Sequence, residues 1–544
     1  MEKRIFLAIA ISIAVLLGWS AIAPRLFPEL AKKPAVKPVA TDTTATRPPV
    51  DVKAPPADTA IAAAPPASPV AATAQQHTIV DTPQYTAVFS NRGAQLISFK
   101  LKNYKQKRSD ELVDLVKARG ANRTDFPFTI VPRDPSLKRL NTALYSVSDQ
   151  VDPKGQRVIQ YRYSDGRVSM TKTFRFAKQP YLFDFNVTMT PPSPYRVAIG
   201  PGIRTLAPEE QDSQVVTTGN GVVEANDKFR IVRREKAPAF HVVPSIQYIG
   251  IEDNYFLSVL RPSRGAEGSL QKVQFSVPQN KTGRADLYAA VNATGDGVVA
   301  GDSFFGPKET KVLDAYGLGE ALQLGYFGLI ARFFLRALLY LNQFTHNYGW
   351  AIIVLTIVIK LVLYPLQHKQ NVSMKKMQRV QPKVEAIKAK YKKARSDAEQ
   401  RNKMNVEMMA LYQKEGINPM AGCLPLVLQL PIVWGFYGLL SRAIELRGAP
   451  FILWMHDLSE KDPYYITPIL MTATMFLQTY LMPSTGDPSQ RRMFLIMPLF
   501  FGFFFKDFPS GVVLYWLVQN ILTIAQQWAM NKWWKDHPPA VQNA

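Results

Sequence analysis

The pattern of hydrophobic and polar positions changes several times along the chain, and it begins with an apolar run at the N-terminus. Residues 5–23 carry no charge and follow Lys3 and Arg4. At about 1.5 Å of rise per residue, a helix of this length spans roughly 28 Å, close to the hydrocarbon thickness of a bilayer. Ala21-Ile22-Ala23 resembles a cleavage site, but Pro24 follows it directly. We therefore expect 1–23 to be an uncleaved transmembrane anchor with its N-terminus inside.

The next two stretches predict a linker and a β-domain. Residues 24–77 are rich in Pro, Ala and Thr, so they bury too little apolar surface to offset their ordering entropy, and an extended linker is expected. From 78 to 313, short segments alternate apolar and polar residues with period two. This pattern predicts a large antiparallel β-sandwich on the trans side of the membrane. Its most regular strands are expected at 157–163, 168–176 and 182–189, with a hairpin turn at Asp165-Gly166.

The last part of the chain is strongly apolar. Segment 324–344 carries Arg332 and Arg336 on one helical face, which favours an interfacial helix lying along the membrane over a span. Segment 367–418 has helical periodicity with a polar break, which predicts a helical hairpin. Membrane spans are expected at about 349–366, 423–441, 464–482, 493–507 and 511–530.

Charge sets the expected topology. The chain has 65 Lys+Arg against 42 Asp+Glu, a formal net charge of +23, and segment 367–418 alone holds 13 Lys/Arg against 5 Asp/Glu. The positive-inside rule places this hairpin in the cytoplasm. The expected fold is a polytopic α-helical membrane protein of six spans with both termini cytoplasmic. Residues 345–531 form its core, and 532–544 form a cytoplasmic tail.

The sequence contains few of the motifs that indicate an enzyme. A single cysteine excludes a disulfide framework, a cysteine-based zinc site and an iron–sulfur cluster. The six histidines are scattered, and neither a P-loop nor a Gly-x-Ser-x-Gly elbow occurs. We expect no enzyme activity, no metal and no cofactor.

Lys360 is the strongest candidate for a functional residue within the spans. An ammonium in hydrocarbon costs about 2.5–3.5 kcal/mol, so such a residue is a functional candidate by default. The alternative is that its long stem reaches the headgroups of the cytoplasmic leaflet. Gln429 in the next span favours a wet cavity, although a hydrogen bond to a neighbouring helix explains an intramembrane amide equally well.

The cations of the hairpin form a candidate docking surface. Anionic lipid, ribosomal RNA or an incoming chain would each suit it, and the alternative is a solvated hairpin whose charge serves topology alone. No aromatic-interleaved motif for reading bases is present, so DNA is not expected as a partner. The candidate docking residues are Lys375, Lys376, Arg379 and Lys383.

Several motifs together resemble the YidC family of membrane insertases, over the chain from anchor to tail. Each motif is weak alone, and their combination is specific. They are Asn347-Tyr-Gly-Trp350, Tyr364-Pro-Leu366, Gln381-Pro-Lys383, Glu407-Met-Met-Ala-Leu-Tyr412, Asn418-Pro419 with Gly422-Cys-Leu-Pro425, and Phe508-Pro-Ser-Gly511.

The resemblance implies an ATP-independent insertase and chaperone of the bacterial inner membrane. Its fold would be a five-helix core with a hydrophilic groove, plus a periplasmic β-sandwich. Lys360 stands at the position of the family's groove cation, which is usually Arg, and a Lys lacks the planar fork of Arg. Thr356, Gln429, Tyr515 and Trp516 match groove or groove-adjacent positions, with Trp516 where many relatives carry Tyr.

The resemblance also implies a set of partners. These are nascent membrane proteins, the Sec translocon with its accessory subunits, and the ribosome with the signal-recognition pathway. A rival hypothesis is a binding protein whose sandwich captures an envelope ligand such as a glycan, with the spans as an anchor. A transporter would need inverted repeats with broken helices, and the sequence shows no such symmetry.

Overall fold

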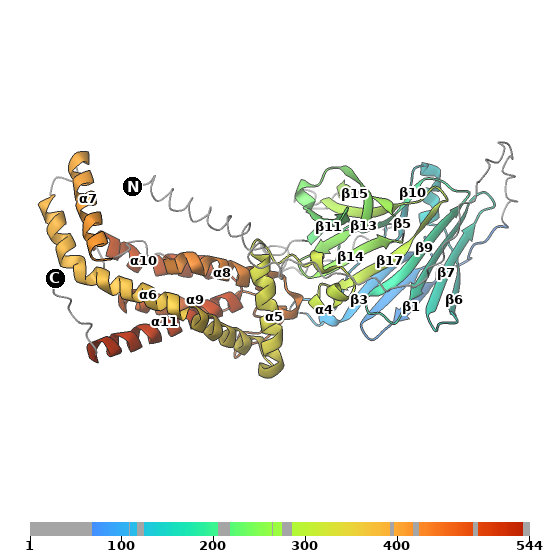
Figure 1. Ribbon diagram of the computed structural model, residues 1–544. Coiled ribbons are helices and arrows are strands. Elements are labelled where there is room, and N and C mark those ends of the chain that lie inside the picture. Colours follow the sequence, from blue (N-terminus) through green and yellow to red (C-terminus); the bar gives the residue numbers. More distant parts are fainter. Residues whose placement is uncertain are drawn as a thin grey trace, which may run out of the picture.

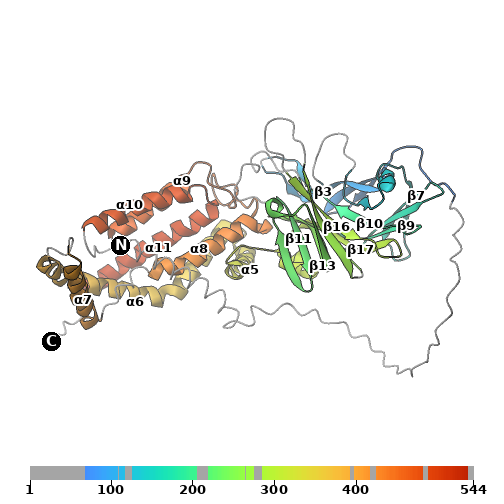
Figure 2. The same cartoon turned by 90° about the horizontal axis from the view of Figure 1, so that it is seen from above.

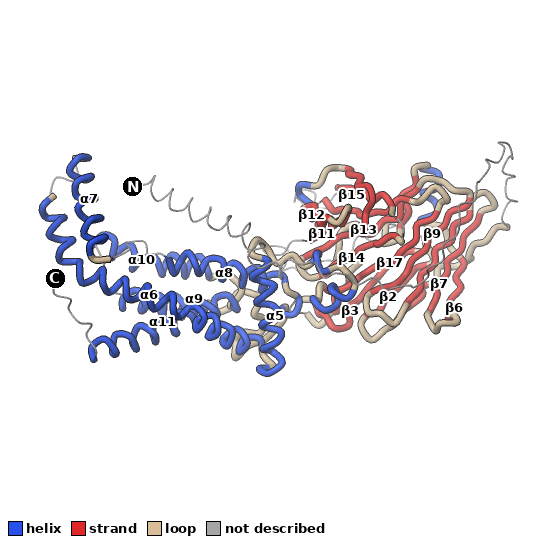
Figure 3. Tube along the Cα trace, viewed as in Figure 1, coloured by secondary structure: helices blue, strands red, loops and turns tan. Residues whose placement is uncertain are grey.

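The computed structural model describes residues 68–107, 109–116, 125–204, 218–263, 265–274, 285–391, 397–416, 424–481 and 488–536. The expected anchor 1–23, most of the expected linker and part of the expected tail lie outside these residues. The described chain forms a β-domain and a helical bundle at opposite ends of an elongated molecule (Figure 1). Strands and helices are almost completely segregated between the two parts (Figure 3).

The β-domain contains two antiparallel sheets. The small sheet has four strands in the order β1-β2-β3-β4. The large sheet has 13 strands along the path β5-β10-β16-β15-β13-β14-β17-β9-β8-β7-β6, with β11 pairing to β12 and β13. The strands are β1 His77–Asp81, β2 Tyr85–Ser90, β3 Gln95–Lys105, β4 Leu112–Asp114, β5 Thr129–Pro132, β6 Ser146–Val151, β7 Arg157–Ser164, β8 Ser169–Phe176, β9 Leu182–Thr190, β10 Tyr195–Ile199, β11 Thr218–Ala225, β12 Lys228–Val232, β13 Phe240–Asp253, β14 Phe256–Pro262, β15 Ala266–Gln274, β16 Ala285–Asn292 and β17 Val298–Pro307.

Period-two patterning accounts for the strands of the large sheet. In β9, Phe183, Phe185 and Val187 are buried while Asp184 and Asn186 between them are exposed, as a strand covered on one face requires. The three strands that the sequence predicts most clearly correspond to β7, β8 and β9. The first two pair in antiparallel register across the turn at Asp165-Gly166, so this hairpin is confirmed.

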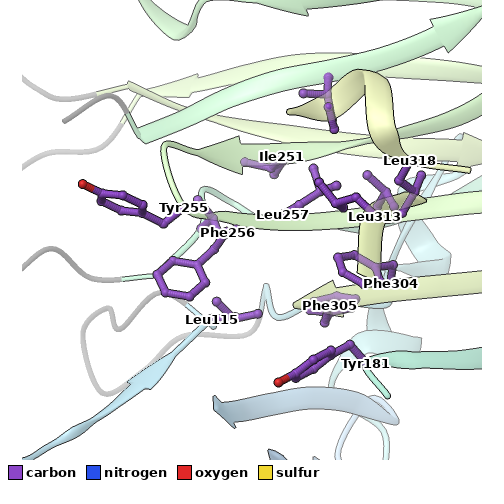
Figure 4. Packing of buried hydrophobic residues seen from close by; sticks show 14 of the residues in the cluster. Leu115, Tyr181, Ile251, Tyr255, Phe256, Leu257, Phe304, Phe305, Leu313 and Leu318 are labelled. Carbon is purple, nitrogen blue, oxygen red and sulfur yellow. The ribbon is translucent and has the colours of Figure 1, made fainter. Parts of the chain in front are cut away.

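An aromatic core joins the two sheets. Phe89 of β2 lies 4.6 Å, between ring centroids, from Phe174 of β8, and Phe99 of β3 lies 5.5 Å from Phe305 of β17. The same core extends to helix α4 (Thr310–Ala315), where Leu313 packs beside the strands of the large sheet (Figure 4). Helix α4 therefore closes one end of the β-domain where the chain leaves it.

The remaining helices belong to the bundle and its attachments. They are α5 Gly328–Thr345, α6 Tyr348–Lys390, α7 Ala398–Lys414, α8 Leu424–Arg442, α9 Ile466–Leu481, α10 Pro488–Phe505 and α11 Ser510–Asp536. By length and hydropathy, one helix among the described residues, α6, is long and apolar enough to cross a membrane, whereas α9 and the stretch Phe494–Phe505 are shorter apolar helices. Within the bundle, α11 packs against α6, α8 and α9.

Helix α6 differs from the pattern of the sequence, which separates a span at 349–366 from a hairpin beginning at 367. The structure has one continuous helix of 43 residues that runs through Pro365 and Pro382. Asn347 caps its start by accepting hydrogen bonds from two backbone N–H groups, at 2.8 and 3.3 Å. The residues of this helix change from mostly apolar to strongly charged after position 366, but the helix continues through that point.

Helices α6 and α7 meet through a small apolar cluster at the end of the bundle farthest from the β-domain (Figure 2). Val380 and Val384 of α6 are buried there, and Met408, Leu411 and Tyr412 of α7 pack on them. Ion pairs flank this cluster, with Lys390 donating to Glu407 at 3.0 Å. The pairing of α6 with α7 therefore rests on a few apolar contacts and exposed charges.

Helix α5 lies crosswise to α6, α8 and α11 at the end of the bundle that faces the β-domain (Figures 1 and 2). Its inner face buries Phe334 and Leu338, while Phe333 and Phe344 project outward and are 58% and 67% exposed. The side that does not pack against protein thus exposes large apolar side chains together with Arg336.

The β-domain contacts the bundle at the end of α8 and along the segment that connects α8 to α9. Asn254 Nδ2 donates to the Ser441 carbonyl at 3.1 Å, and Glu445 Oε1 accepts from the backbone N–H of Thr310 at 2.9 Å. Lys107 forms an ion pair with Glu460 at 3.1 Å. These contacts fix the end of the bundle nearest the β-domain against a folded body.

Candidate functional site

Lys360 lies on the side of α6 that faces α11. Its side chain is 8% exposed, and its ammonium donates a hydrogen bond to Thr523 Oγ1 at 2.8 Å. Thr523 in turn donates to the Gln519 carbonyl at 2.7 Å within α11. Among the residues that the structure describes, no carboxylate lies within ion-pair distance of the ammonium. The charge is therefore held between two helices by a neutral hydroxyl.

Thr356 stands one helical turn before Lys360 and is fully buried. Its hydroxyl donates to the Ile352 carbonyl at 2.6 Å, so the hydroxyl is satisfied inside its own helix. A hydroxyl that donates to a carbonyl of its own helix has no hydrogen left to donate to a neighbouring helix or a substrate. Thr356 thus adds little polarity of its own beside Lys360.

Gln429 and Tyr515 are brought together by α8 and α11. Gln429 Nε2 donates to the Tyr515 hydroxyl oxygen at 2.8 Å. The Tyr515 side chain is fully buried, and its ring stacks on Phe436 of α8 at 4.5 Å between centroids. Of the two explanations that the sequence leaves open for Gln429, the structure contains the interhelical hydrogen bond.

Trp516 follows Tyr515 in α11 and points to a different neighbour. Its ring lies 4.7 Å from that of Phe505 and 5.8 Å from that of Phe501, both on α10. Because consecutive residues in a helix are rotated by about 100°, the two aromatic residues cannot share a face. Trp516 therefore fills the contact between α10 and α11 and takes no part in the bond between Gln429 and Tyr515.

Further polar side chains of α11 continue the surface that begins at Tyr515. Gln519, Thr523 and Gln526 recur at helical spacing, and Gln519 Oε1 and Gln526 Nε2 are buried without a hydrogen-bond partner among the described residues. Sequence reasoning missed all three. Their signal is a polar residue at every third or fourth position of an apolar helix. We call Lys360, Gln429, Tyr515, Gln519 and Thr523 the polar cluster.

The four candidate docking residues follow one another along the end of α6 that leads to α7. Lys376, Arg379 and Lys383 are exposed, and Lys383 forms an ion pair with Glu415 at 2.7 Å. Lys375 is half-buried, and its pKa lies below the usual value because burial disfavours the ammonium and Arg379 repels it. The structure thus leaves part of this positive surface facing solvent and uses part of it to hold α7.

A metal centre has no ligand set within the described ranges. No group of three or more His, Cys, Asp or Glu side chains there is arranged to hold a metal ion. Cys423 lies outside the described residues. The chemistry that the described site offers is hydrogen bonding and positive charge inside an apolar bundle.

Comparison with known proteins covers both parts of the chain. Residues 340–537 match the family model of the 60Kd inner membrane protein, and residues 78–337 match that of the YidC periplasmic domain. The membrane protein insertase YidC of Geotalea uraniireducens is 35% identical over 98% of this chain and 99% of its own length. That of Geobacter metallireducens is 35% identical over 98% of each chain. A crystal structure of an active YidC insertase aligns with 85% of this chain and 94% of its own, at 20% identity and a TM-score of 0.37.

Proposed function

Because the chain belongs to the YidC family of membrane protein insertases, an inner membrane family with a periplasmic domain, we propose that its polar cluster is the site where insertion begins. In this proposal the chain inserts, folds and helps to assemble membrane proteins without ATP. The cluster lines a hydrophilic groove between the helices of the core, which receives the polar tail of an incoming chain.

One observation carries this proposal, namely the uncompensated charge of Lys360. A buried ammonium is normally paired with a carboxylate, because an unpaired charge in a low-dielectric interior is costly. Here the described partner is the hydroxyl of Thr523, so the positive charge stays available to an acidic group. The unpaired Oε1 atom of Gln519 adds an acceptor for a polar group of the incoming chain.

The proposed topology has six spans with both termini and the hairpin in the cytoplasm and the β-domain in the periplasm. Two features support it. The β-domain and α7 lie at opposite ends of the bundle (Figure 2). The residues around α7 carry the excess of Lys and Arg that marks cytoplasmic segments.

The proposed mechanism separates the polar and apolar parts of the substrate. The polar tail enters the groove, where Lys360 offsets part of the desolvation of acidic groups, while the apolar segment moves into lipid along α8 and α10. Exposed Ile496 and Phe500 give α10 an apolar surface for this step. Burial of the substrate's apolar residues, at roughly 25 cal/mol per Å², supplies the driving force. The membrane potential adds about 2.3 kcal/mol per negative charge moved outward per 100 mV.

Partners follow from the same proposal. Nascent membrane proteins would be the substrates, received either alone or beside the Sec translocon and its accessory subunits. The ribosome, the signal-recognition pathway or anionic lipids would meet the exposed cations Lys376 and Arg379. Replacing both by Gln should weaken binding of ribosomes to proteoliposomes and leave an Lys154→Gln control in the β-domain unaffected.

The test is insertion into liposomes that contain the purified full-length protein. Two single-span substrates that differ only in an acidic or a neutral outer tail are compared in wild type, Lys360→Ala and Lys360→Arg. Lys403→Ala serves as a matched control, because Lys403 is exposed on α7 and pairs with Glu399. We expect Lys360→Ala to reduce insertion of the acidic tail more than that of the neutral tail, and Lys360→Arg to retain both. Equal loss for both tails would refute the charge role, and full activity of Lys360→Ala would reduce Lys360 to a structural residue.

A second candidate function has an observation of its own in the β-domain. A cleft of about 700 Å³ lies over β8, β9, β17 and β14. Arg175, Asp184, Asp302 and Arg261 stand directly opposite one another across these four strands, which gives the cleft a row of charged groups. A polar envelope ligand would suit such a surface. Deleting residues 78–310 separates the candidates, since insertion should survive if the core performs it and should disappear if the β-domain does.

A further inference from the structure

An apolar groove runs between α9 and α10, away from the polar cluster. The groove is open along its side and has a volume of about 650 Å³. Its walls are almost entirely carbon, and several of its side chains are open to the surroundings, with Ile469 and Leu499 each 63% exposed. The residues that line this α9–α10 groove are Tyr465, Pro468, Ile469, Thr472, Ala473, Phe476, Leu499, Gly502, Phe503 and Lys506.

The floor of the groove is a close contact between the two helices. A Cβ placed on Gly502 would lie 2.1 Å from Thr472 Oγ1, so only glycine permits this approach. The Thr472 hydroxyl donates to the Pro468 carbonyl at 2.7 Å and is therefore already satisfied. The interior of the groove consequently offers no free hydrogen-bonding group at this point, and it suits an occupant that is itself apolar.

The end of the groove nearest the β-domain is positively charged. Lys506 pairs with Asp507 at 2.8 Å, and Lys461 pairs with the same carboxylate at 3.3 Å. Two ammonium groups thus share one carboxylate, which leaves an excess of one positive charge among these three side chains. Tyr465, which also lines the groove, lies under Lys461, with its ring centroid 5.9 Å from the ammonium.

The location of this charged end follows from its neighbours. Glu460, next to Lys461, forms the ion pair with Lys107 of the β-domain. In the proposed topology the charged end therefore lies at the periplasmic surface of the membrane, where headgroups begin. The groove extends from there toward the middle of the bilayer.

We propose that the α9–α10 groove binds one anionic phospholipid, with an acyl chain in the groove and the phosphate at Lys461 and Lys506. The inference rests on the proposed membrane placement of α9 and α10 and not on the insertion mechanism. The two ammonium groups at the end of the groove favour a negatively charged headgroup. The apolar walls of the groove match the acyl chain of the same lipid.

The experiment titrates the full-length protein in detergent with phosphatidylglycerol or phosphatidylcholine of identical acyl chains. Bound lipid is counted by native mass spectrometry. The charge variant is Lys461→Gln with Lys506→Gln, and its matched control is Lys390→Gln with Lys403→Gln, two exposed lysines that also form ion pairs. The groove variant is Ala473→Trp, which places a large ring in the groove from an exposed position.

We expect one site that prefers phosphatidylglycerol. The charge variant removes two positive charges and should lower its affinity about thirtyfold, which corresponds to about 2 kcal/mol at about 1 kcal/mol per lysine near a headgroup. It should leave phosphatidylcholine unaffected, whereas Ala473→Trp should weaken both lipids and the control should weaken neither. Free inorganic phosphate should not displace the lipid.

Three results would overturn the proposal. Unchanged phosphatidylglycerol binding in both variants would show that the groove holds no lipid. Displacement by inorganic phosphate would reduce the site to a phosphate site, and displacement by an apolar helical peptide would make the occupant a protein segment. Because the measurement is lipid binding, any of these results leaves the proposed insertase function untouched.

Discussion

Replacing Lys172 by Met tests how the two sheets of the β-domain are held together. Lys172 belongs to β8 and is completely buried. Its ammonium lies 3.4 Å from the Ala94 carbonyl, and its two short hydrogen bonds go to the carbonyls of Gly93 at 2.7 Å and of Phe128 at 2.8 Å. Both acceptor residues have left-handed backbone conformations, with φ of 71° and 69°, which turn their carbonyls toward the same point. Met has a similar length and shape but donates no hydrogen bond.

The magnitude follows from the two carbonyls that lose a short hydrogen bond. An unsatisfied buried carbonyl costs about 1–3 kcal/mol, so two of them cost about 2–6 kcal/mol. Removing a buried amine returns part of this, because its own desolvation is relieved. We expect Lys172→Met to lower the free energy of unfolding of the β-domain by about 2 kcal/mol at pH 7.

The effect should also depend on pH. Burial lowers the pKa of Lys172 to about 7 from 10.5, so between these values the unfolded chain binds more protons than the folded chain. Stability of the wild type should therefore rise with pH above 7, by at most about 1.4 kcal/mol per pH unit from this group. The neutral amine still donates two hydrogens, so its contacts survive. Met does not titrate, and the difference between wild type and Lys172→Met should widen from pH 7 to pH 9.

The assay is urea unfolding of the full-length protein in detergent, with pulse proteolysis of the β-domain at each urea concentration and pH. Lys154→Met is the control, because Lys154 is exposed in the turn between β6 and β7. A Lys172→Met protein as stable as the wild type at every pH would refute the reasoning. If Lys172→Met lowers the stability by the same amount at every pH, the lowered pKa of Lys172 is refuted, and the stabilising role of its hydrogen bonds remains.

Three further predictions concern single contacts. Glu445→Ala removes the acceptor at the start of α4 and should raise tryptic cleavage within α4, since a lost cap costs about 0.5–2 kcal/mol. Gly93→Ala should destabilise the β-domain more than Gly155→Ala in the same urea assay, because a Cβ at Gly93 would lie 2.2 Å from a backbone carbonyl oxygen whereas Gly155 has open space. If both variants lose the same free energy of unfolding, the steric clash at Gly93 is refuted, and only the cost of a left-handed backbone, about 1–2 kcal/mol, acts at both positions. Asp462→Ala should lower the thermal unfolding temperature of the bundle, because this carboxylate accepts the backbone N–H of Thr467 at 2.7 Å at the start of α9, and Asp462→Asn should recover part of the loss.

Local patterning predicts individual elements of this protein better than it predicts how they join. The alternation in β7, β8 and β9 is visible in the sequence because one face of each strand is buried and the other is not. The continuation of α6 beyond Pro365 is not visible, because a proline inside a helix costs stability that tertiary contacts can offset. The pairing of sheets through Lys172 depends on residues far apart in the sequence, which no local pattern records.

The candidate site shows the same division. Lys360 is identifiable because a charge in an apolar segment is conspicuous, whereas its partner Thr523 is an ordinary helical threonine. The sequence leaves a wet cavity and a neighbouring helix as alternative surroundings for Gln429, and only the packing of α8 on α11 brings it to Tyr515. Gln519 was missed because its spacing matters only once the helix face that contains it is known.

The proline at position 365 gives α6 a mechanical joint. It removes one backbone N–H and leaves the Leu361 carbonyl without its usual partner, so a bending load applied to the helix is relieved there. The joint lies five residues beyond Lys360, roughly 7 Å along the helix axis. It therefore separates the Lys360 ammonium from the second part of α6, which leads to α7. A force on the hairpin would therefore swing the far end of α6, while the bond between Lys360 and Thr523 stays in place.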